Sequence, residues 1–152
     1  MEYEIKVLTE SDIEIVHNFA KSNARPEGVS EMEFEMQSWS APWREESLKH
    51  YLPNGWCFGF YDKTTDSLHG FSLAQPFCFF RGLTQTLWLE YFLGDSEEVK
   101  ELILDTAYRT ARSKHLQSLV IYDTTDCKEA LASYKAEALQ DHSVLIKTTK
   151  FK

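Results

Sequence analysis

The sequence predicts an α/β fold in which helices flank a mixed, mostly antiparallel central sheet. Aromatic-rich apolar runs at 56–61, 68–80 and 87–93 are separated by turn residues, which is typical of neighbouring antiparallel strands. A helical pattern over 99–116 then leads from the last of these runs to another apolar run at 118–122. Strand, helix, strand in this order indicates a right-handed crossover between two parallel strands.

Length and composition are those of one globular domain, residues 1–152, because a chain of this size can bury its own core. No apolar run is long enough to cross a bilayer, and the first residues lack the basic start and apolar stretch of a signal peptide. Cys57, Cys78 and Cys127 show no metal-ligand spacing. We therefore expect buried free thiols in a protein of the reducing cytoplasm, without a metal or a membrane segment.

The charge of the chain excludes one class of partner. A net charge of -8 argues against nucleic-acid binding, which needs clustered lysines and arginines to neutralise phosphates. Residues 1–46 hold 11 acidic and 4 basic residues, a balance of -7. If this segment lines a cleft, it would favour a cationic ligand. A solvated helical face that keeps the protein soluble is the commoner explanation.

The first half of the chain predicts one strand and two or three helices. Residues 4–8 alternate as a short strand, and Thr9 and Asp12 offer caps for a following helix. The apolar positions of that helix are Ile13, Val16, Phe19 and Ala20. Residues 31–38 fit either a helix or an extended lid. A further helix begins near Pro42 and runs to Leu52, where Pro53, Asn54 and Gly55 stop it.

The second half predicts a three-strand meander, the crossover, and a short tail. Residues 62–67 have turn composition and join two runs into a hairpin. Pro76 lies inside the second run and, lacking an N–H group, indicates a bulge or an unpaired edge. After a helix that bears Tyr134, residues 143–151 leave room for one terminal strand.

Two side chains in this arrangement suggest acid–base chemistry. Glu90 is the one carboxylate within the apolar run 87–93, and Tyr134 follows the second strand of the crossover. Both would lie near the carboxyl edge of the two parallel strands, where open sheets bind ligands. A carboxylate and a phenol can supply a general base and a general acid. The structural alternatives are that Glu90 reaches solvent or pairs with Arg81 or a lysine, and that Tyr134 packs as an amphipathic filler.

Other candidate residues have less specific patterns. The five histidines show no metal-ligand spacing. An aromatic wall around a cation is one hypothesis for a group of rings, and simple core packing is the commoner alternative. These rings belong to Phe34, Trp39, Trp43, Trp56 and Tyr61.

The order of elements resembles that of the Gcn5-related N-acetyltransferase superfamily, over nearly the whole chain. Residues 5–9 with Asp12 resemble its first strand and helix, and residues 41–43 look like the Pro-Trp of ribosomal-protein acetyltransferases. Residues 87–92 are similar to the central strand of the spermidine/spermine acetyltransferases. Residues 130–139 are similar to the Ala-x-x-Leu-Tyr-x-x-x-Gly-Phe pattern of the superfamily.

The resemblance implies an acyl-CoA-dependent N-acyltransferase that uses acetyl-CoA and acts on a small cationic amine. Glu90 would deprotonate the amine, and Tyr134 would protonate the leaving sulfur. The implied donor-binding positions are Tyr91, Phe92, Leu93, Gly94, Asp95, Ser96 and Cys127, the last standing where the superfamily often has an asparagine. Pairing of edge strands would make a homodimer.

One feature departs from the superfamily and leaves a second function open. Its members hold the pyrophosphate in an Arg/Gln-x-x-Gly-x-Gly/Ala loop, whereas this loop is short and is followed by Glu97 and Glu98. We expect Asp95 or Ser96 to cap the next helix and the two glutamates to fill its first turn. The alternative function is therefore a degenerate relative that has lost acetyl-CoA and acts as a non-catalytic binding or interaction module.

Overall fold

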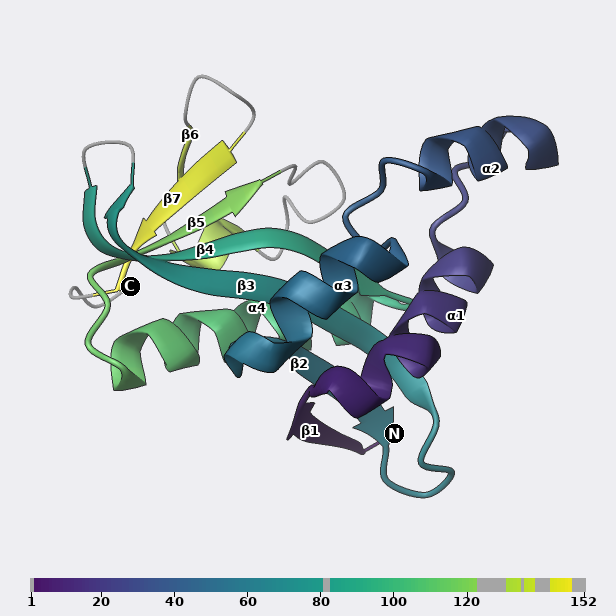
Figure 1. The fold of residues 1–152 in the computed structure, drawn as a ribbon. Coiled ribbons are helices and arrows are strands. Elements are labelled where there is room, and N and C mark those ends of the chain that lie inside the picture. Colours follow the sequence, from purple (N-terminus) through teal and green to yellow (C-terminus); the bar gives the residue numbers. More distant parts are fainter. Residues whose placement is uncertain (1, 81–82, 123–130, 135, 139–142, 149–152) are drawn as a thin grey trace.

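The computed structural model describes residues 2–80, 83–122, 131–134, 136–138 and 143–148 (Figure 1). As the sequence predicts, one strand and a group of helices precede a three-strand meander, a crossover helix and a further strand. Their order is β1 (Tyr3–Val7), the short 3-10 helix η1 (Glu10–Asp12), α1 (Ile13–Asn23), α2 (Glu31–Ser38), α3 (Glu45–Tyr51), η2 (Leu52–Asn54), β2 (Phe58–Asp62), β3 (Leu68–Phe80), β4 (Leu83–Gly94), α4 (Glu97–Ser113), β5 (Ser118–Tyr122), η3 (Ala132–Tyr134), β6 (Glu137–Ala138) and β7 (Ser143–Lys147).

The strands of the described residues form one seven-stranded sheet in the order β1-β2-β3-β4-β5-β7-β6. Strands β4 and β5 are parallel, and α4 connects them. The other described pairs are antiparallel. The mixed, mostly antiparallel sheet and its crossover helix are therefore confirmed.

Helices cover both faces of the sheet (Figure 1). Helix α4 packs against the face formed by Leu87 and Leu89 of β4 and by Leu119 of β5. Helices α1 and α3 pack against the opposite face, where Phe71 and Leu73 of β3 are fully buried. The β4–β5 pair therefore lies inside a three-layer arrangement.

The β2–β3 hairpin and its proline follow the sequence prediction. The last pair between the two strands joins Phe58 to Ser72, so β3 runs on beyond the end of β2. Pro76 lies in this extension and pairs with Leu87 of β4 on its other side. The missing N–H of the proline therefore faces an edge that β2 does not pair with, as predicted.

A register shift in β4 occurs at Glu90. Leu73 of β3 pairs with Tyr91, and the next residue, Ala74, pairs with Leu89, so Glu90 is an extra residue on β4, as in a β-bulge. Before the shift, Leu87 and Leu89 face α4; after it, Tyr91 packs with α1 and α3 instead. The bulge thus reverses the alternation of the strand and turns Glu90 and Tyr91 toward the same region.

Two sequence predictions about this fold were wrong. The tail forms two strands, β6 and β7, rather than one. Strand β6 has only two residues, too few for an alternating pattern, and it is defined by its pairing with β7. Cys78 is exposed rather than buried, because it lies on the part of β3 that extends beyond β2. Cys57 is buried as predicted, and Cys127 lies outside the described residues.

Residues 31–38, for which the sequence fits a helix or a lid, form helix α2. Ser30 caps it by accepting a hydrogen bond from the backbone N–H of Glu33 at 3.1 Å. Within the described part of the chain, no helix has the length and apolar character needed to span a membrane.

Candidate active site

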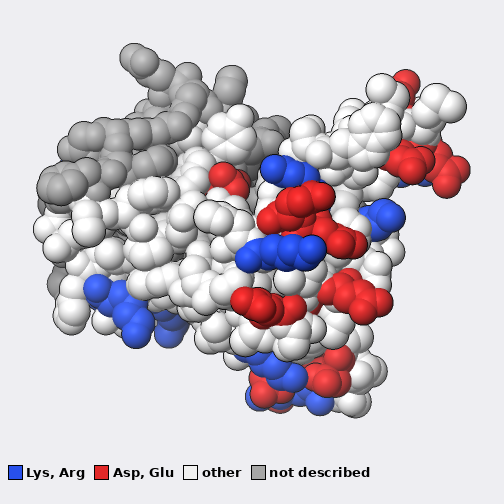
Figure 2. All heavy atoms as spheres, viewed as in Figure 1, with Lys and Arg blue, Asp and Glu red and all other residues white. Residues whose placement is uncertain are grey.

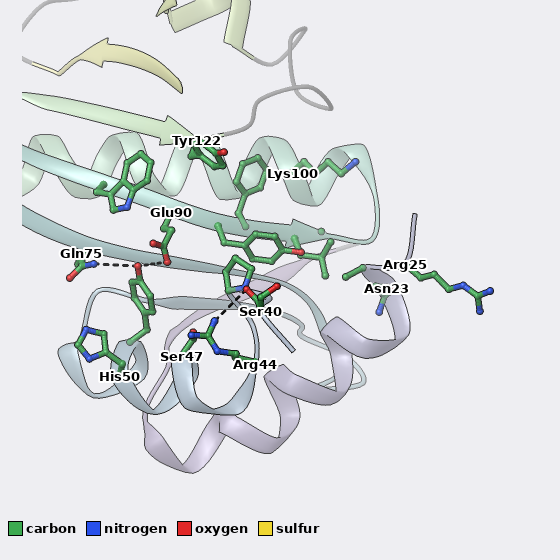
Figure 3. A pocket seen from close by; sticks show the side chains of 18 of the residues that line it. Asn23, Arg25, Ser40, Arg44, Ser47, His50, Gln75, Glu90, Lys100 and Tyr122 are labelled. Atoms are coloured by element: carbon green, nitrogen blue, oxygen red, sulfur yellow. Dashed lines mark hydrogen bonds between the residues drawn. The ribbon is translucent and has the colours of Figure 1, made fainter. Parts of the chain in front are cut away.

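A cavity of about 1070 Å³ opens where β4 and β5 part (Figure 3). The described pairs between the two parallel strands end with Leu89 and Ile121, whereas β4 continues to Gly94. The cavity lining includes Glu90, residues 91–94 of the continuing strand, and Tyr122 at the end of β5. The cavity therefore lies at the carboxyl edge of the parallel pair, where the sequence places its ligand site.

Glu90 points into this cavity and is held by a hydrogen-bond chain (Figure 3). The hydroxyl of Tyr51 donates a short hydrogen bond to Glu90 Oε2. Gln75 Nε2 in turn donates to the hydroxyl oxygen of Tyr51 at 3.2 Å. The three side chains come from β4, α3 and β3, so the chain joins a helix of one layer to two strands of the sheet.

Tyr51 is positioned by the burial of α3. Leu48 and Tyr51 are buried against the sheet, while Ser47 and His50 of the same helix line the cavity. Glu45 and Glu46 in the first turn and Lys49 and His50 in the last turn agree with the helix dipole. Burial, and then the hydrogen bond and negative charge of Glu90, raise the pKa of Tyr51 far above its usual value. Tyr51 is therefore a neutral donor throughout the physiological pH range.

Tyr134 lies elsewhere. Its hydroxyl donates to Asp105 Oδ1 of α4 at 3.2 Å, and its ring packs against Tyr108 with centroids 5.0 Å apart. Burial, followed by the charge of Asp105, raises the pKa of Tyr134 to about 12. Tyr134 is not among the described residues that line the cavity of Glu90. Its role as a general acid stays a prediction, since the hydroxyl would first have to leave Asp105.

The start of α4 is closed by its own side chains, as the sequence predicts. Ser96 is the N-cap and accepts a hydrogen bond from the backbone N–H of Val99 at 3.2 Å. Asp95 Oδ2 instead lies 2.7 Å from Nδ1 of His69. Glu97 lies in the first turn and pairs with Lys100 at 3.3 Å.

The glycines beside this turn serve packing. Gly70 and Gly94 are cross-strand partners on β3 and β4. A Cβ atom on Gly70 would lie 2.5 Å from Cγ1 of Val99, and one on Gly94 would lie 3.0 Å from the same atom. Their lack of side chains lets Val99, which is fully buried, rest directly on the sheet. Gly94 thus brings α4 close to β4.

The acidic residues of the first 46 positions do not line this cavity. Among the described residues, the cavity lining holds Arg25, Arg44 and Lys100, and its only acid is Glu90. Figure 2 shows charged side chains of both signs over the helices α1 to α3 and a largely uncharged surface over the adjoining sheet. The glutamates of the first segment are exposed, as the commoner explanation predicts. Four of them, Glu31, Glu35, Glu45 and Glu46, border a second hollow together with Lys21, Arg25 and Arg44.

The aromatic wall proposed from the sequence does not surround this cavity. Trp43 and Tyr61 are buried in the core, and Trp43 stacks on Phe34 with ring centroids 5.8 Å apart. Trp39 is 71% exposed. The aromatic residues that line the cavity are Tyr51, Trp88, Tyr91, Phe92 and Tyr122.

Sequence reasoning missed Tyr51 and Trp88. Trp88 stands two residues before Glu90, so strand alternation places both on one face, and this signal was available. Tyr51 is separated from Glu90 by 39 positions and carries no local signal. Among the described residues, no group of three histidine, cysteine, aspartate or glutamate side chains is arranged to hold a metal ion.

Solved structures share this architecture. A probable acetyltransferase from Staphylococcus epidermidis superposes with a TM-score of 0.74 at 15% identity, covering 97% of this chain and 99% of its own. The Drosophila melanogaster polyamine N-acetyltransferase that forms N-acetylagmatine gives 0.72 at 10% identity, covering 96% and 100%. The PaiA N-acetyltransferase of Thermoplasma acidophilum, solved with coenzyme A, gives 0.64 at 15% identity, covering 96% and 98%.

No protein-family model matches the sequence, and no curated protein does so either. At these identities the structural likeness establishes the fold: an acyl-CoA N-acyltransferase fold of the Gcn5-related type.

Proposed function

We propose that this chain, which has the fold of the Gcn5-related N-acetyltransferases, is an acyl-CoA-dependent N-acyltransferase with a small amine as its acceptor. One observation carries the proposal. The extra residue of β4 is a carboxylate, Glu90, and it points into a large cavity at the place where the two parallel strands separate. Bulges of this kind re-aim side chains beside active sites.

The residues around the cavity fit an acyl-CoA by charge. Lys100 and Arg25 lie on the side of the cavity opposite Gln75 and His50 (Figure 3). Two cations there would hold phosphate groups. Beyond Leu89, no described residue of β5 pairs with β4, so the backbone of residues 91–93 would position the thioester. Gly94, Asp95 and Ser96 would border the phosphates. Cys127, which lies outside the described residues, is proposed to touch the acyl-CoA.

The acyl-CoA supplies an activated thioester. Glu90 takes a proton from the ammonium group of the acceptor, so that the nitrogen lone pair is free to form the new bond to the acyl carbon. When the carbon–nitrogen bond has formed, the nitrogen releases its second surplus proton to water. Tyr134, once its hydroxyl has left Asp105, gives its proton to the sulfur as the carbon–sulfur bond breaks, and it recovers a proton from water. The products are an amide and a free thiol, and Glu90 releases its proton to solvent.

The acceptor that this site favours is a primary amine. Glu90 is the only described acid of the lining, and the aromatic rings of Trp88 and Tyr91 border the same space. An ammonium group gains from a carboxylate and from aromatic faces together. The activity of the Drosophila polyamine enzyme, which shares the fold, supports amines of this kind.

A second candidate function rests on a different observation. The amides at the start of α4 are capped by Ser96, and Glu97 and Glu98 occupy the first turn. A helix start that supplies its own negative charges favours a second anion less. In this alternative the fold would serve as a binding module without catalysis.

Turnover and thermal shift separate the two candidates. The test incubates the protein with acetyl-CoA and agmatine, spermidine or phenethylamine and follows thiol release. The proposal predicts thiol release that needs both substrates, together with a rise in melting temperature at millimolar acetyl-CoA. A protein that shows neither response would support the binding module.

A further inference from the structure

We propose that Tyr51 and Gln75 are positioning residues that hold Glu90 in its reactive orientation, an inference that rests on the proposed function. A glutamate side chain has three rotatable bonds, and a base must be held in one orientation to take a proton efficiently. The Tyr51 hydroxyl fixes one of the two oxygens, Oε2. Oε1 is then left for the acceptor nitrogen.

Gln75 gives the chain its direction. A tyrosine hydroxyl has one proton and accepts with its lone pairs. Because Gln75 Nε2 donates into the hydroxyl oxygen, the single proton of Tyr51 is directed to Glu90. Tyr51 therefore holds the base and leaves the acid role to another group. An amide at position 75 suits this task, since it presents a donor without a charge.

Packing around Tyr51 and Gln75 makes this hydrogen-bond chain rigid. Tyr51 is 5% exposed and ends α3, and Leu48 of α3 and Leu52, the first residue of η2, are fully buried. Gln75 follows Ala74, which is buried against the opposite layer. Each donor is therefore fixed by packing that is independent of substrate, so the orientation of Glu90 exists before the acceptor arrives.

Three substitutions test the hydrogen-bond chain through the turnover number, kcat. Tyr51→Phe removes the hydroxyl but keeps the ring, and we expect kcat to fall about tenfold while KM for acetyl-CoA stays unchanged. Gln75→Glu turns a donor into an acceptor that competes for the Tyr51 proton, and it should lower kcat as much. Gln75→Leu removes a donor but introduces no competing acceptor, so Tyr51 still donates to Glu90 and kcat should fall less. Tyr61→Phe is the matched control, because Tyr61 is equally buried and lies outside the cavity.

A spectroscopic measurement tests the contact without any acceptor. The Cζ carbon of tyrosine reports on the hydrogen bonding of its hydroxyl, and the spectrum of Tyr51→Phe identifies the Tyr51 signal. With ¹³C-labelled tyrosine, Glu90→Gln should move this signal, and Gln75→Leu should move it as well.

The outcomes are distinct. Equal kcat values for Tyr51→Phe and Tyr61→Phe in an active enzyme would overturn the inference and leave the proposed function standing. An unmoved Tyr51 signal in Glu90→Gln would also overturn it. A wild-type protein without turnover would remove the proposed function first, and the positioning role would fall with it.

Discussion

The two ends of the cavity are built differently. At one end Glu90 accepts a hydrogen bond from Tyr51, which in turn accepts one from Gln75, and the carboxylate faces the cavity. At the other end, the side chain of Ser96 accepts a hydrogen bond from the first turn of α4, and Gly70 and Gly94 let Val99 of that helix pack closely against the sheet. The carboxylate of Glu90 is thus held open to the cavity, whereas the helix end is closed locally. In the proposed function, phosphate binding at the helix end depends on Arg25 and on Lys100, which pairs with Glu97. In the proposed function, the position of the base is therefore fixed more strictly than that of the phosphates.

Removal of the base tests the first end with the largest expected effect. Glu90→Gln keeps the shape of the side chain but cannot accept the ammonium proton, so kcat should fall about 100-fold. Thiol release with a saturating amine measures it. Glu14→Gln, on the exposed surface of α1, is the control for the same chemical change. Equal rates for the two variants would remove Glu90 from the mechanism.

Packing at the helix end is the next test. Gly70→Ala forces a methyl group against Val99 and against the carbonyl oxygen of Leu93, which would lie only 2.9 Å from the new Cβ atom. We expect a loss of about 1–3 kcal/mol in the free energy of unfolding, measured by urea denaturation. Gly94→Ala meets its neighbours at 3.0 Å or more and should cost less. The reverse order would contradict the packing role given to Gly70.

Loss of the cap has a smaller effect. Ser96→Ala leaves the N–H of Val99 without its side-chain acceptor, at a cost of about 1 kcal/mol in unfolding free energy. Ser30→Ala removes the equivalent bond from α2, a short helix without buried residues, so global unfolding should change less. The comparison is sharpened by acetyl-CoA affinity, which should respond to Ser96→Ala and stay constant in Ser30→Ala.

The smallest expected effect concerns the cations. Lys100→Gln should weaken acetyl-CoA binding about fivefold, because a single partly screened charge is worth about 1 kcal/mol. The loss should shrink as salt is added. Lys63→Gln, in the β2–β3 turn, provides the control. Calorimetric affinities that agree for both variants would exclude Lys100 from the donor site.

Local sequence patterns predicted the structural features that depend only on residues close together in the chain. The capping of α4 by Ser96 follows from four adjacent positions, and the hairpin from two runs around one turn. Glu90 was identified because burying a lone carboxylate in an apolar strand costs free energy unless the carboxylate is paired or hydrogen-bonded. Strand β6 and the bulge were not predictable, since both are defined by pairing with another strand.

The tyrosine beside Glu90 was also not predictable, because its contact with Glu90 joins residues far apart in the sequence. The sequence predicts a carboxylate and a phenol in one crevice and assigns the phenol to Tyr134. The structure places Tyr51 there through a contact across 39 positions, and Tyr134 bonds to Asp105. Patterns suggest the chemistry of a site, whereas the contact of Tyr51 with Glu90 arises from tertiary packing, and the acid role of Tyr134 stays a prediction.

Hydrogen exchange with acetyl-CoA present tests the central claim most directly, because residues 91–94 line the cavity beyond the last pair of β4 with β5. If acyl-CoA binds where Glu90 lies, exchange of the amides of these residues should slow at least tenfold at saturating acetyl-CoA. Exchange rates that stay the same in this segment would contradict the account.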